Sequence, residues 1–319
     1  MKKIILLLIL INFCFADIVQ KYREDGINAV ISELDNILMS ENYWRKYLDS
    51  VDTKIGFFEK DIEILLANKS KKELKLFSYK NSKLHPVTKY SSIFGKNGGE
   101  KTKEGDLKTP NGSYMLTSKL IKVDPFYGPF AFVTSYPNLY DRSKGKGGHG
   151  IWVHGFPMNK QVRETNTKGC VALDNNLLVD LDKRINHKKT IIIINETDIM
   201  QPSKSDLAII LSNMYKWKRA WERSDINEYL SFYDKDFLRF DGMNLTNFSK
   251  YKQLIFSRKE QKIITFKEFI ITPNPTVSGE NIYRVGFYET YIASSHKFNG
   301  YKEIFVKVEK NKMKIVTEQ

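Results

Sequence analysis

The sequence predicts a mainly β domain, preceded by a helical N-terminal extension and followed by an α+β cone. Three patterns lead to this prediction. Apolar residues recur every three or four positions in the extension, residues 17–54. Short strand-like runs and glycine-rich loops fill residues 55–200. In residues 201–319, amphipathic helical stretches give way to two strand hairpins, which completes a two-domain plan for the 319-residue chain.

Residues 1–16 have the pattern of a secretory signal peptide. Lys2 and Lys3 give a positive start, and the apolar run from Ile4 to Ile11 is too short to span a bilayer comfortably. Small residues at Cys14 and Ala16 predict cleavage after Ala16. An uncleaved N-terminal anchor is the alternative. We expect a periplasmic protein without stable membrane insertion once the signal has been removed.

The formal net charge of +14 favours anionic partners. In an exported protein, a membrane surface or an acidic wall polymer fits this charge better than nucleic acid, which we do not expect as a partner. The lysines are spread along the chain rather than gathered in arms, so an ordinary solvated surface also accounts for them. Charge alone therefore identifies no partner.

The extension carries one apolar helical face, which we expect to act as a lid or brace on the domain after it. The face consists of Ile27, Val30, Ile31, Leu34, Ile37 and Leu38.

In the central region, β-branched and aromatic residues predict strands bounded by turns. The expected strands are 62–66, 74–79, 130–134, 151–154 and 190–194. Several glycines between residues 145 and 150 mark a loop that leads into the strand ending at His154. One short helix is expected after Cys170.

The cone is expected to begin at Gln201–Ser203, where proline ends one element and serine can cap the next. An amphipathic helical stretch runs from Leu207 to Tyr229. The dipeptide Asn299–Gly300 predicts a hairpin turn between strands 283–294 and 304–308.

After signal cleavage, Cys170 is the sole remaining thiol. Exported proteins seldom keep an unpaired exposed thiol without a use, although a buried, inert cysteine is the alternative. A thiol attacks a carbonyl well only as a thiolate, so the site needs a base and donors for the developing oxyanion.

His154 and Gly169 can supply the base and the donors. Strand alternation places His154 on the same face as Trp152 and opposite Val153, so that it faces a pocket. Gly169 permits a tight turn that aims the amides of Gly169 and Cys170 into one small space. We therefore predict Cys170 as nucleophile, His154 as its base, and Gly169 as part of an oxyanion hole.

Three motifs resemble the L,D-transpeptidase (YkuD-type) catalytic domain: Thr109–Tyr114, His154–Gly155 and Thr167–Val171. The resemblance covers roughly residues 55–195. It implies a β-sandwich that recognises the stem peptide of peptidoglycan, attacks the bond between the L-centre of a diamino acid and the following D-residue, and requires no metal or cofactor. Two positions depart from the family pattern, with Lys168 in place of histidine and Ala172 in place of arginine.

The C-terminal region resembles a nuclear transport factor two-like cone, on the strength of Trp217, Trp221, Asp225, Tyr229, Tyr233 and Phe237. The combination is similar to L,D-carboxypeptidases that trim wall tetrapeptides to tripeptides in helical Gram-negative bacteria. Their active-site loop also resembles the run from His149 to Gly155. This resemblance implies a carboxypeptidase that affects cell shape, with the cone as a candidate surface for protein partners.

Five further residues are candidates for substrate binding. Thr167 belongs to the cysteine motif. Lys168 either stabilises the thiolate and alters acceptor handling or is a solvated loop lysine. His149 either orients His154 or touches substrate, or is an ordinary loop residue. Trp152 forms a pocket wall or packs in the core, and Tyr127 lies on a loop that can reach substrate.

Other functions fit parts of the pattern. An L,D-transpeptidase forms a crosslink when an amine, instead of water, attacks the thioester. A non-catalytic wall-binding scaffold is a further alternative, and it predicts an unreactive Cys170. A papain-like protease is disfavoured because its cysteine precedes its histidine by a long interval, whereas here His154 comes first.

Overall fold

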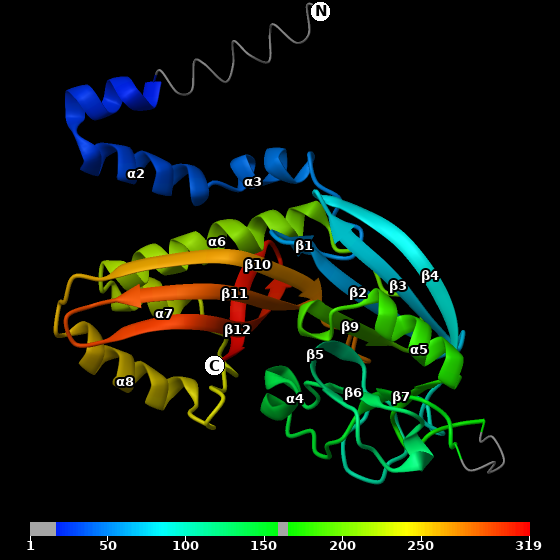
Figure 1. Cartoon of the computed structure of the whole chain (residues 1–319). Helices are drawn as coiled ribbons and strands as arrows, with labels where there is room; N and C mark the ends of the chain where they lie inside the picture. The colour runs from blue at the N-terminus through cyan, green and yellow to red at the C-terminus, as the bar shows by residue number, and fades with distance from the viewer. Residues whose placement is uncertain (1–16, 159–164) are drawn as a thin grey trace, which may run out of the picture.

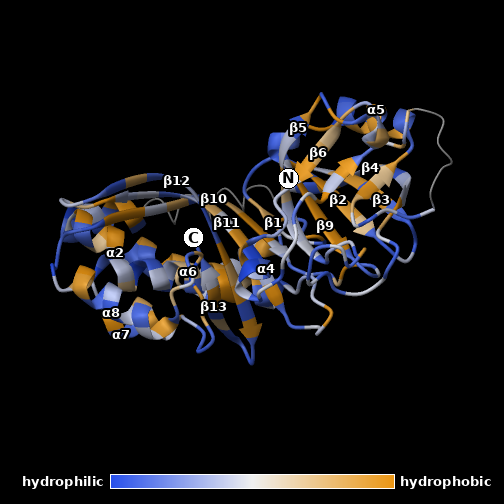
Figure 2. Ribbon diagram, turned by 90° about the horizontal axis from the view of Figure 1, so that it is seen from below, coloured by the Kyte–Doolittle hydropathy of each residue, from blue (hydrophilic) through white to orange (hydrophobic). Residues whose placement is uncertain are grey.

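The computed structural model describes residues 17–158 and 165–319. The predicted signal peptide, residues 1–16, lies outside the described residues. Figure 1 shows the N-terminal helices above a body in which the cone and the mainly β domain lie side by side, and Figure 2 shows these two parts as separate lobes. In the described part of the chain, no helix combines the length and apolar character needed to cross a membrane.

The extension forms α2 (Ile27–Leu38) and α3 (Glu41–Leu48), and α3 packs against the cone. The ring of Trp44 is buried, stacks on Tyr215 of the cone with centroids 5.8 Å apart, and donates from Nε1 to the carbonyl of Leu38 at 2.7 Å. The extension therefore braces the distant cone rather than the domain that directly follows it. Much of the predicted apolar face of α2 stays exposed, for example Ile31 at 51%.

Eight strands of the central domain close into a barrel in the order β2-β3-β4-β8-β7-β6-β5-β9. Most neighbours are antiparallel, but β2–β9 and β7–β8 are parallel. The strands are β2 (Ile62–Asn68), β3 (Glu73–Lys80), β4 (Lys83–Ile93), β5 (Gly112–Leu120), β6 (Ala131–Thr134), β7 (Trp152–His154), β8 (Val171–Leu173) and β9 (Thr190–Asn195). The mainly β prediction is confirmed, and β4, β5 and β8 are strands that the sequence patterns missed.

Short helices connect the barrel strands. They are η1 (Pro125–Tyr127), α4 (Leu139–Ser143), α5 (Asn175–Arg184) and η2 (His187–Lys189). The helix expected after Cys170 is α5, which begins where the Asp174 side chain accepts from the amide of Asn176 at 3.0 Å. Leu178 and Leu181 of this helix are fully buried in the barrel core, so α5 is fixed directly behind the strand that follows Cys170.

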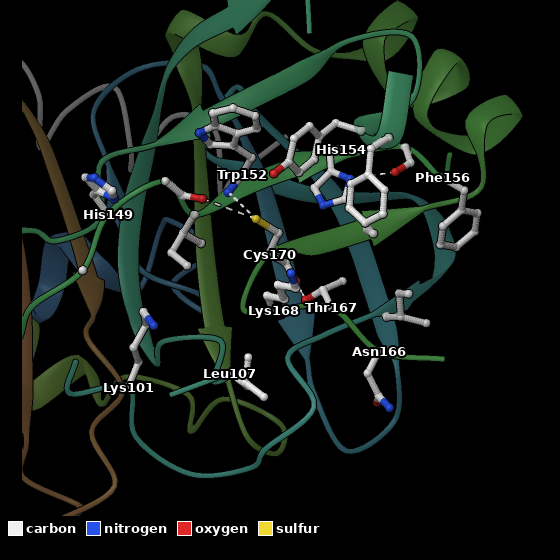
Figure 3. Close-up of a pocket in the computed structure, with 18 of the residues that line it drawn as sticks. Lys101, Leu107, His149, Trp152, His154, Phe156, Asn166, Thr167, Lys168 and Cys170 are labelled. Atoms are coloured by element: carbon white, nitrogen blue, oxygen red, sulfur yellow. Dashed lines mark hydrogen bonds between the residues drawn. The ribbon is translucent and has the colours of Figure 1, made fainter. Parts of the chain in front are cut away.

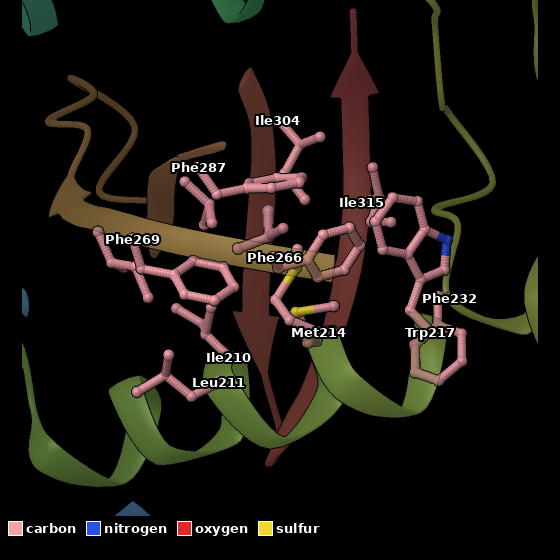
Figure 4. Packing of buried hydrophobic residues seen from close by; sticks show 14 of the residues in the cluster. Ile210, Leu211, Met214, Trp217, Phe232, Phe266, Phe269, Phe287, Ile304 and Ile315 are labelled. Carbon is pink, nitrogen blue, oxygen red and sulfur yellow. The ribbon is translucent and has the colours of Figure 1, made fainter. Parts of the chain in front are cut away.

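The cone packs three helices against a curved sheet, as predicted. Its helices are α6 (Lys204–Glu222), α7 (Ile226–Ser231) and α8 (Leu245–Phe256), and its sheet contains β1 (Phe57–Phe58), β10 (Ile263–Pro273), β11 (Ile282–Ile292), β12 (Lys297–Glu309) and β13 (Lys312–Glu318). The hydroxyl of Ser203 caps α6 by accepting from the Asp206 amide at 2.9 Å. Figure 4 shows Met214 and Trp217 of α6 packed against Phe266 and Phe287 of the sheet.

The predicted turn at Asn299–Gly300 is wrong. Both residues lie inside β12, where Asn299 pairs with Thr290 and Gly300 pairs with Glu289. The hairpin turns at residues 293–296 instead, closed by a bond from the Ala293 amide to the His296 carbonyl at 2.9 Å. Gly300 packs closely on a neighbouring side chain, since a Cβ there would lie 2.9 Å from the ring of Phe298.

The two lobes share a buried interface. β1 pairs with β10 of the cone, although the chain continues from β1 into the barrel. Across the same boundary, the hydroxyls of Ser113 and Thr272 lie 2.8 Å apart, and the Ser113 amide donates to Asn274 Oδ1 at 2.9 Å. Buried polar groups need partners, so these bonds fix how the cone sits behind β5.

Candidate active site

A cavity of about 420 Å³ opens beside β7 and β8, and both Cys170 and His154 line it. These short strands are parallel neighbours, with Val153 paired to Val171 and His154 paired to Ala172. The pairing brings the strand that ends in His154 next to the strand that follows Cys170. Figure 3 shows both side chains at the cavity wall.

The Cys170 thiol is half-buried and makes two hydrogen bonds across the cavity wall. Sγ donates to the carbonyl of Gly150 at 3.3 Å and accepts from the amide of Trp152 at 3.4 Å (Figure 3). Burial raises the pKa of the Cys170 thiol, against the opposing effects of the Trp152 amide and the Lys101 charge. The resting residue is therefore a thiol that must lose its proton before it can attack.

His154 is buried, with 5% of its surface exposed, and this burial lowers its pKa to about 4. The imidazole is therefore neutral at neutral pH and can accept a proton. Nδ1 lies 2.6 Å from the carbonyl of Gly155, which can only accept, so Nδ1 carries the ring proton and Nε2 is the basic atom. In this conformation the thiol proton points to Gly150, and base catalysis requires it to turn toward the imidazole.

Thr167 builds the turn that holds the nucleophile. Its hydroxyl accepts from the amide of Gly169 at 3.0 Å and donates to the carbonyl of Cys170 at 2.7 Å. Its backbone is anchored in turn, because its amide donates to the Phe94 carbonyl at 2.8 Å and its carbonyl accepts from Lys96 at 3.0 Å. Thr167 lines the cavity but acts mainly on the backbone around Cys170.

Gly169 cannot be replaced by another residue without strain. Its φ is 138°, and a Cβ would lie 2.9 Å from the carbonyl of Lys108. Its amide, one of the two donors expected for the oxyanion, is engaged by Thr167. The amide of Cys170 is the other donor of that pair. In this conformation, therefore, only the Cys170 amide of this pair can donate a hydrogen bond to a substrate oxygen.

Tyr127 and Trp152 form an aromatic wall beside the base. The Tyr127 ring lies edge-on to both neighbours, with centroids 5.1 Å from Trp152 and 5.1 Å from His154. The carbonyl of Tyr127 accepts from the Gly155 amide at 2.9 Å, which ties this loop to the end of β7. Both predicted residues line the cavity, and Tyr127 also holds the His154 ring in place.

Asn175 supports the base from behind, and the sequence patterns did not single it out. Its Oδ1 accepts from the amide of Phe156 at 2.8 Å, and its Nδ2 donates to the carbonyl of the same residue at 3.1 Å. A Cβ at Gly155 would lie 2.1 Å from Asn175 Oδ1, so the glycine after His154 is required by this contact. A polar residue at the start of a helix carries no local sign of such a role.

Besides His154, three basic side chains line the same cavity: His149, Lys168 and Lys101. His149 and Lys168 are exposed at the rim, whereas Lys101 is buried with 3% of its surface exposed. Lys101 was not among the predicted site residues, because it lies 69 positions before Cys170 in a loop without a recognisable motif. Seven of the predicted residues thus line one cavity: Cys170, His154, Thr167, Lys168, His149, Trp152 and Tyr127. The eighth, Gly169, is buried next to them and bonded to Thr167.

A second cavity, of about 480 Å³, lies in the cone around Lys252. The ammonium of Lys252 lies 4.8 Å from the ring of Trp221, and burial lowers its pKa to about 8. Because Cys170 and His154 line the first cavity, we place the chemistry there.

Two family models match the chain, one for each lobe. Residues 62–194 match the L,D-transpeptidase catalytic domain, YkuD, and residues 209–319 match the Cds6 C-terminal NTF2-like domain. Among curated proteins, the putative L,D-transpeptidase YafK of Escherichia coli K12 is 31% identical over 91 residues. That match spans 28% of this chain and 32% of YafK, so the chain covers about a third of that relative.

Solved structures match over most of the chain. The helical cell shape determining protein Pgp2 from Campylobacter jejuni is 40% identical with a TM-score of 0.82, covering 88% of this chain and 99% of that one. A mutant form of Pgp2 gives 39% identity and a TM-score of 0.83. Bd1075 from Bdellovibrio bacteriovorus is 27% identical with a TM-score of 0.66, covering 84% of this chain and 96% of that one. The chain therefore belongs to the family of L,D-transpeptidase-domain proteins with a C-terminal NTF2-like domain that includes Campylobacter Pgp2.

Proposed function

We propose that this protein is a periplasmic peptidoglycan L,D-carboxypeptidase that removes the terminal D-alanine from stem tetrapeptides and leaves tripeptides. The observation that carries the proposal is the Cys170 thiol beside a neutral, buried His154 in one cavity of an L,D-transpeptidase-family domain. In this proposal residues 1–16 direct export. The similarity to a protein named for helical cell shape supports a role in shaping the cell.

The reaction is a two-step acyl transfer. Nε2 of His154 takes the thiol proton, and Sγ of Cys170 forms a bond to the carbonyl carbon that precedes the D-alanine. The carbonyl oxygen becomes an oxyanion that accepts from the Cys170 amide. When the tetrahedral intermediate collapses, the carbon–nitrogen bond breaks and the imidazolium gives its proton to the leaving D-alanine amine. A thioester on Cys170 remains.

Water completes the hydrolysis. His154 removes a proton from the water as its oxygen attacks the thioester carbon, and the sulfur–carbon bond breaks. The thiolate then recovers the proton from the imidazolium, and the tripeptide leaves with a new carboxylate. If the amine of a second stem peptide attacks first, the same thioester gives a crosslink, which is the transpeptidase alternative.

The residues beside the nucleophile favour water as the acceptor. Lys168 is exposed at the cavity rim, where its positive charge opposes the approach of a protonated acceptor amine. Ala172 pairs with His154 and offers no polar group with which to orient an acceptor. Orienting a second reactant contributes up to about 7–11 kcal/mol to a barrier, so a site that does not hold the amine leaves the thioester to water.

The test is turnover of a defined stem tetrapeptide by the wild type and by Cys170→Ala and His154→Ala. Both variants should fold and yield no tripeptide, because nucleophile and base act as a unit. Near-normal activity in either folded variant would refute the assigned roles. An inactive wild type with a thiol inert to alkylation would favour the scaffold alternative.

A further inference from the structure

Charge is distributed unevenly around Cys170. Figure 3 shows Lys101 and His149 on one side of the nucleophile, with Phe156 and Asn166 on the other. A peptide bound across Cys170 must place its leaving residue on one of these two sides. A leaving residue at the end of a peptide carries a carboxylate, so the basic side suits it.

Lys101 is held in place more firmly than the two basic residues at the rim. Its ammonium donates to Asp106 Oδ1 at 2.7 Å and to the carbonyl of Lys103 at 3.1 Å. An ammonium has three N–H groups, so one remains beyond these bonds within the described part of the chain. The side chain is thus fixed beforehand, and binding a ligand costs little additional side-chain entropy.

Asp106 keeps the Lys101 loop rigid. It accepts from the amides of Thr102 at 2.9 Å and Lys103 at 3.2 Å in addition to the Lys101 ammonium. Burial alone would raise its pKa, but the Lys101 bond and the backbone amides lower the pKa of Asp106 to about 2. The carboxylate therefore stays ionised and keeps its bond to the Lys101 ammonium.

Two loops meet on the basic side and bound the cavity there. The amide of Gly147 donates to the carbonyl of Thr102 at 2.9 Å. A Cβ at Gly148 would lie 3.3 Å from the backbone of Glu104 and 3.4 Å from the Lys101 side chain, so the loops are already in contact. A peptide that continued past its leaving residue would have to displace one of them.

Lys101 and Cys170 line the same cavity, so a positive charge lies on the side where a leaving residue would end. Burial raises the pKa of the Cys170 thiol, and the positive charge of Lys101 opposes this rise. The carboxylate of a leaving D-amino acid lies about one residue length, roughly 3.8 Å, beyond the carbonyl that Cys170 attacks. Glu104 lines the same side, but it is exposed to solvent, where its charge is screened.

We propose that the Lys101 ammonium binds the terminal carboxylate of the leaving D-amino acid and so selects peptides that end at that residue. This inference rests on the proposed carboxypeptidase function and adds the residue that reads the end of the substrate. Lys101 pairs with a charge that an internal peptide bond lacks, so the preference for a free terminus comes from this contact.

The test compares two substrates: a stem tetrapeptide with a free C-terminal carboxylate and the same peptide ending in D-alaninamide. The full-length wild type should hydrolyse the acid at least tenfold faster, in kcat/KM, than the amide. In Lys101→Met, kcat/KM for the acid should fall about tenfold or more, while the amide changes less than twofold. Lys101→Arg should keep most of the preference because it keeps the charge.

Two further variants keep the test decisive. Lys101→Met with Asp106→Asn removes both charges, so that no buried carboxylate is left unpaired, and it should show the same loss of preference. Lys168→Met is the matched control, and its acid-to-amide ratio should stay that of the wild type. If Lys101 had only a structural role, Lys101→Met would lower kcat/KM equally for both substrates.

The outcomes separate this inference from the function on which it rests. A wild type that cleaves acid and amide alike, or a ratio that survives Lys101→Met, overturns the inference and leaves the carboxypeptidase standing. If the acid-to-amide ratio of kcat/KM falls only in Lys168→Met, the inference about Lys101 is also overturned. A wild type that cleaves no tetrapeptide overturns both.

Discussion

Replacing Thr167 by valine should loosen the turn that carries the nucleophile without changing its shape. Valine matches threonine in size but has no hydroxyl, so the amide of Gly169 and the carbonyl of Cys170 both lose their partner. Each lost hydrogen bond costs roughly 1 kcal/mol, which gives a destabilisation of about 2 kcal/mol. Because a misplaced nucleophile reacts poorly, we also expect kcat to fall by about ten- to a hundredfold.

The assay measures tripeptide formation and thermal melting for Thr167→Val and for the control Thr167→Ser, which keeps the hydroxyl. The serine variant should stay within about twofold of the wild type. KM should change little in either variant, since Thr167 acts on the backbone around Cys170 rather than on substrate. Wild-type kcat in Thr167→Val, or equal damage in both variants, would refute this explanation of the turn.

The burial of the site and the domain boundary lead to two other predictions. Because burial raises the pKa of Cys170, alkylation of the thiol by iodoacetamide should be slow at pH 7 and rise about tenfold per pH unit above it. Because burial lowers the pKa of His154 to about 4, hydrolysis of the stem peptide should persist at pH 5. Fast, pH-independent alkylation would instead indicate a resting ion pair between Cys170 and His154. At the domain boundary, the Val277 amide donates to Glu100 at 3.3 Å, and Glu100 accepts from Lys146 at 2.9 Å. Val277→Pro removes this amide proton and should lower both the melting temperature and turnover. An equal effect of Val277→Ala, which keeps the amide, would show that the amide is irrelevant.

Much of the fold could be predicted from local patterns because each pattern has a direct physical cause. Serine before an apolar helical repeat predicted the start of α6 at Ser203, and alternation predicted β7 with Val153 buried. The strand β1 could not be predicted in this way, since its partner in the cone lies more than 200 residues further along the chain. The turn expected at Asn299–Gly300 was wrong because the pairing of β11 with β12 outweighed the local preference.

The site shows the same division between local and long-range information. That Cys170, His154 and Gly169 lie close together in the fold could be predicted, because a thiol, a strand-borne histidine and a turn glycine stand close in the sequence. The places of Lys101 and Asn175 beside this site could not be predicted, because they depend on side chains that reach other loops in the folded chain. The resting bond of the thiol to Gly150 is likewise set by three-dimensional packing.

The central claim is that water, rather than a second stem peptide, attacks the thioester on Cys170. The most direct measurement incubates the purified protein with stem tetrapeptide, alone and with an excess of acceptor stem peptide, and identifies all products by mass. A carboxypeptidase should give tripeptide and free D-alanine as the main products in both reactions, with none from Cys170→Ala. Crosslinked or D-amino-acid-exchanged peptide as the main product would contradict the carboxypeptidase and identify a transpeptidase.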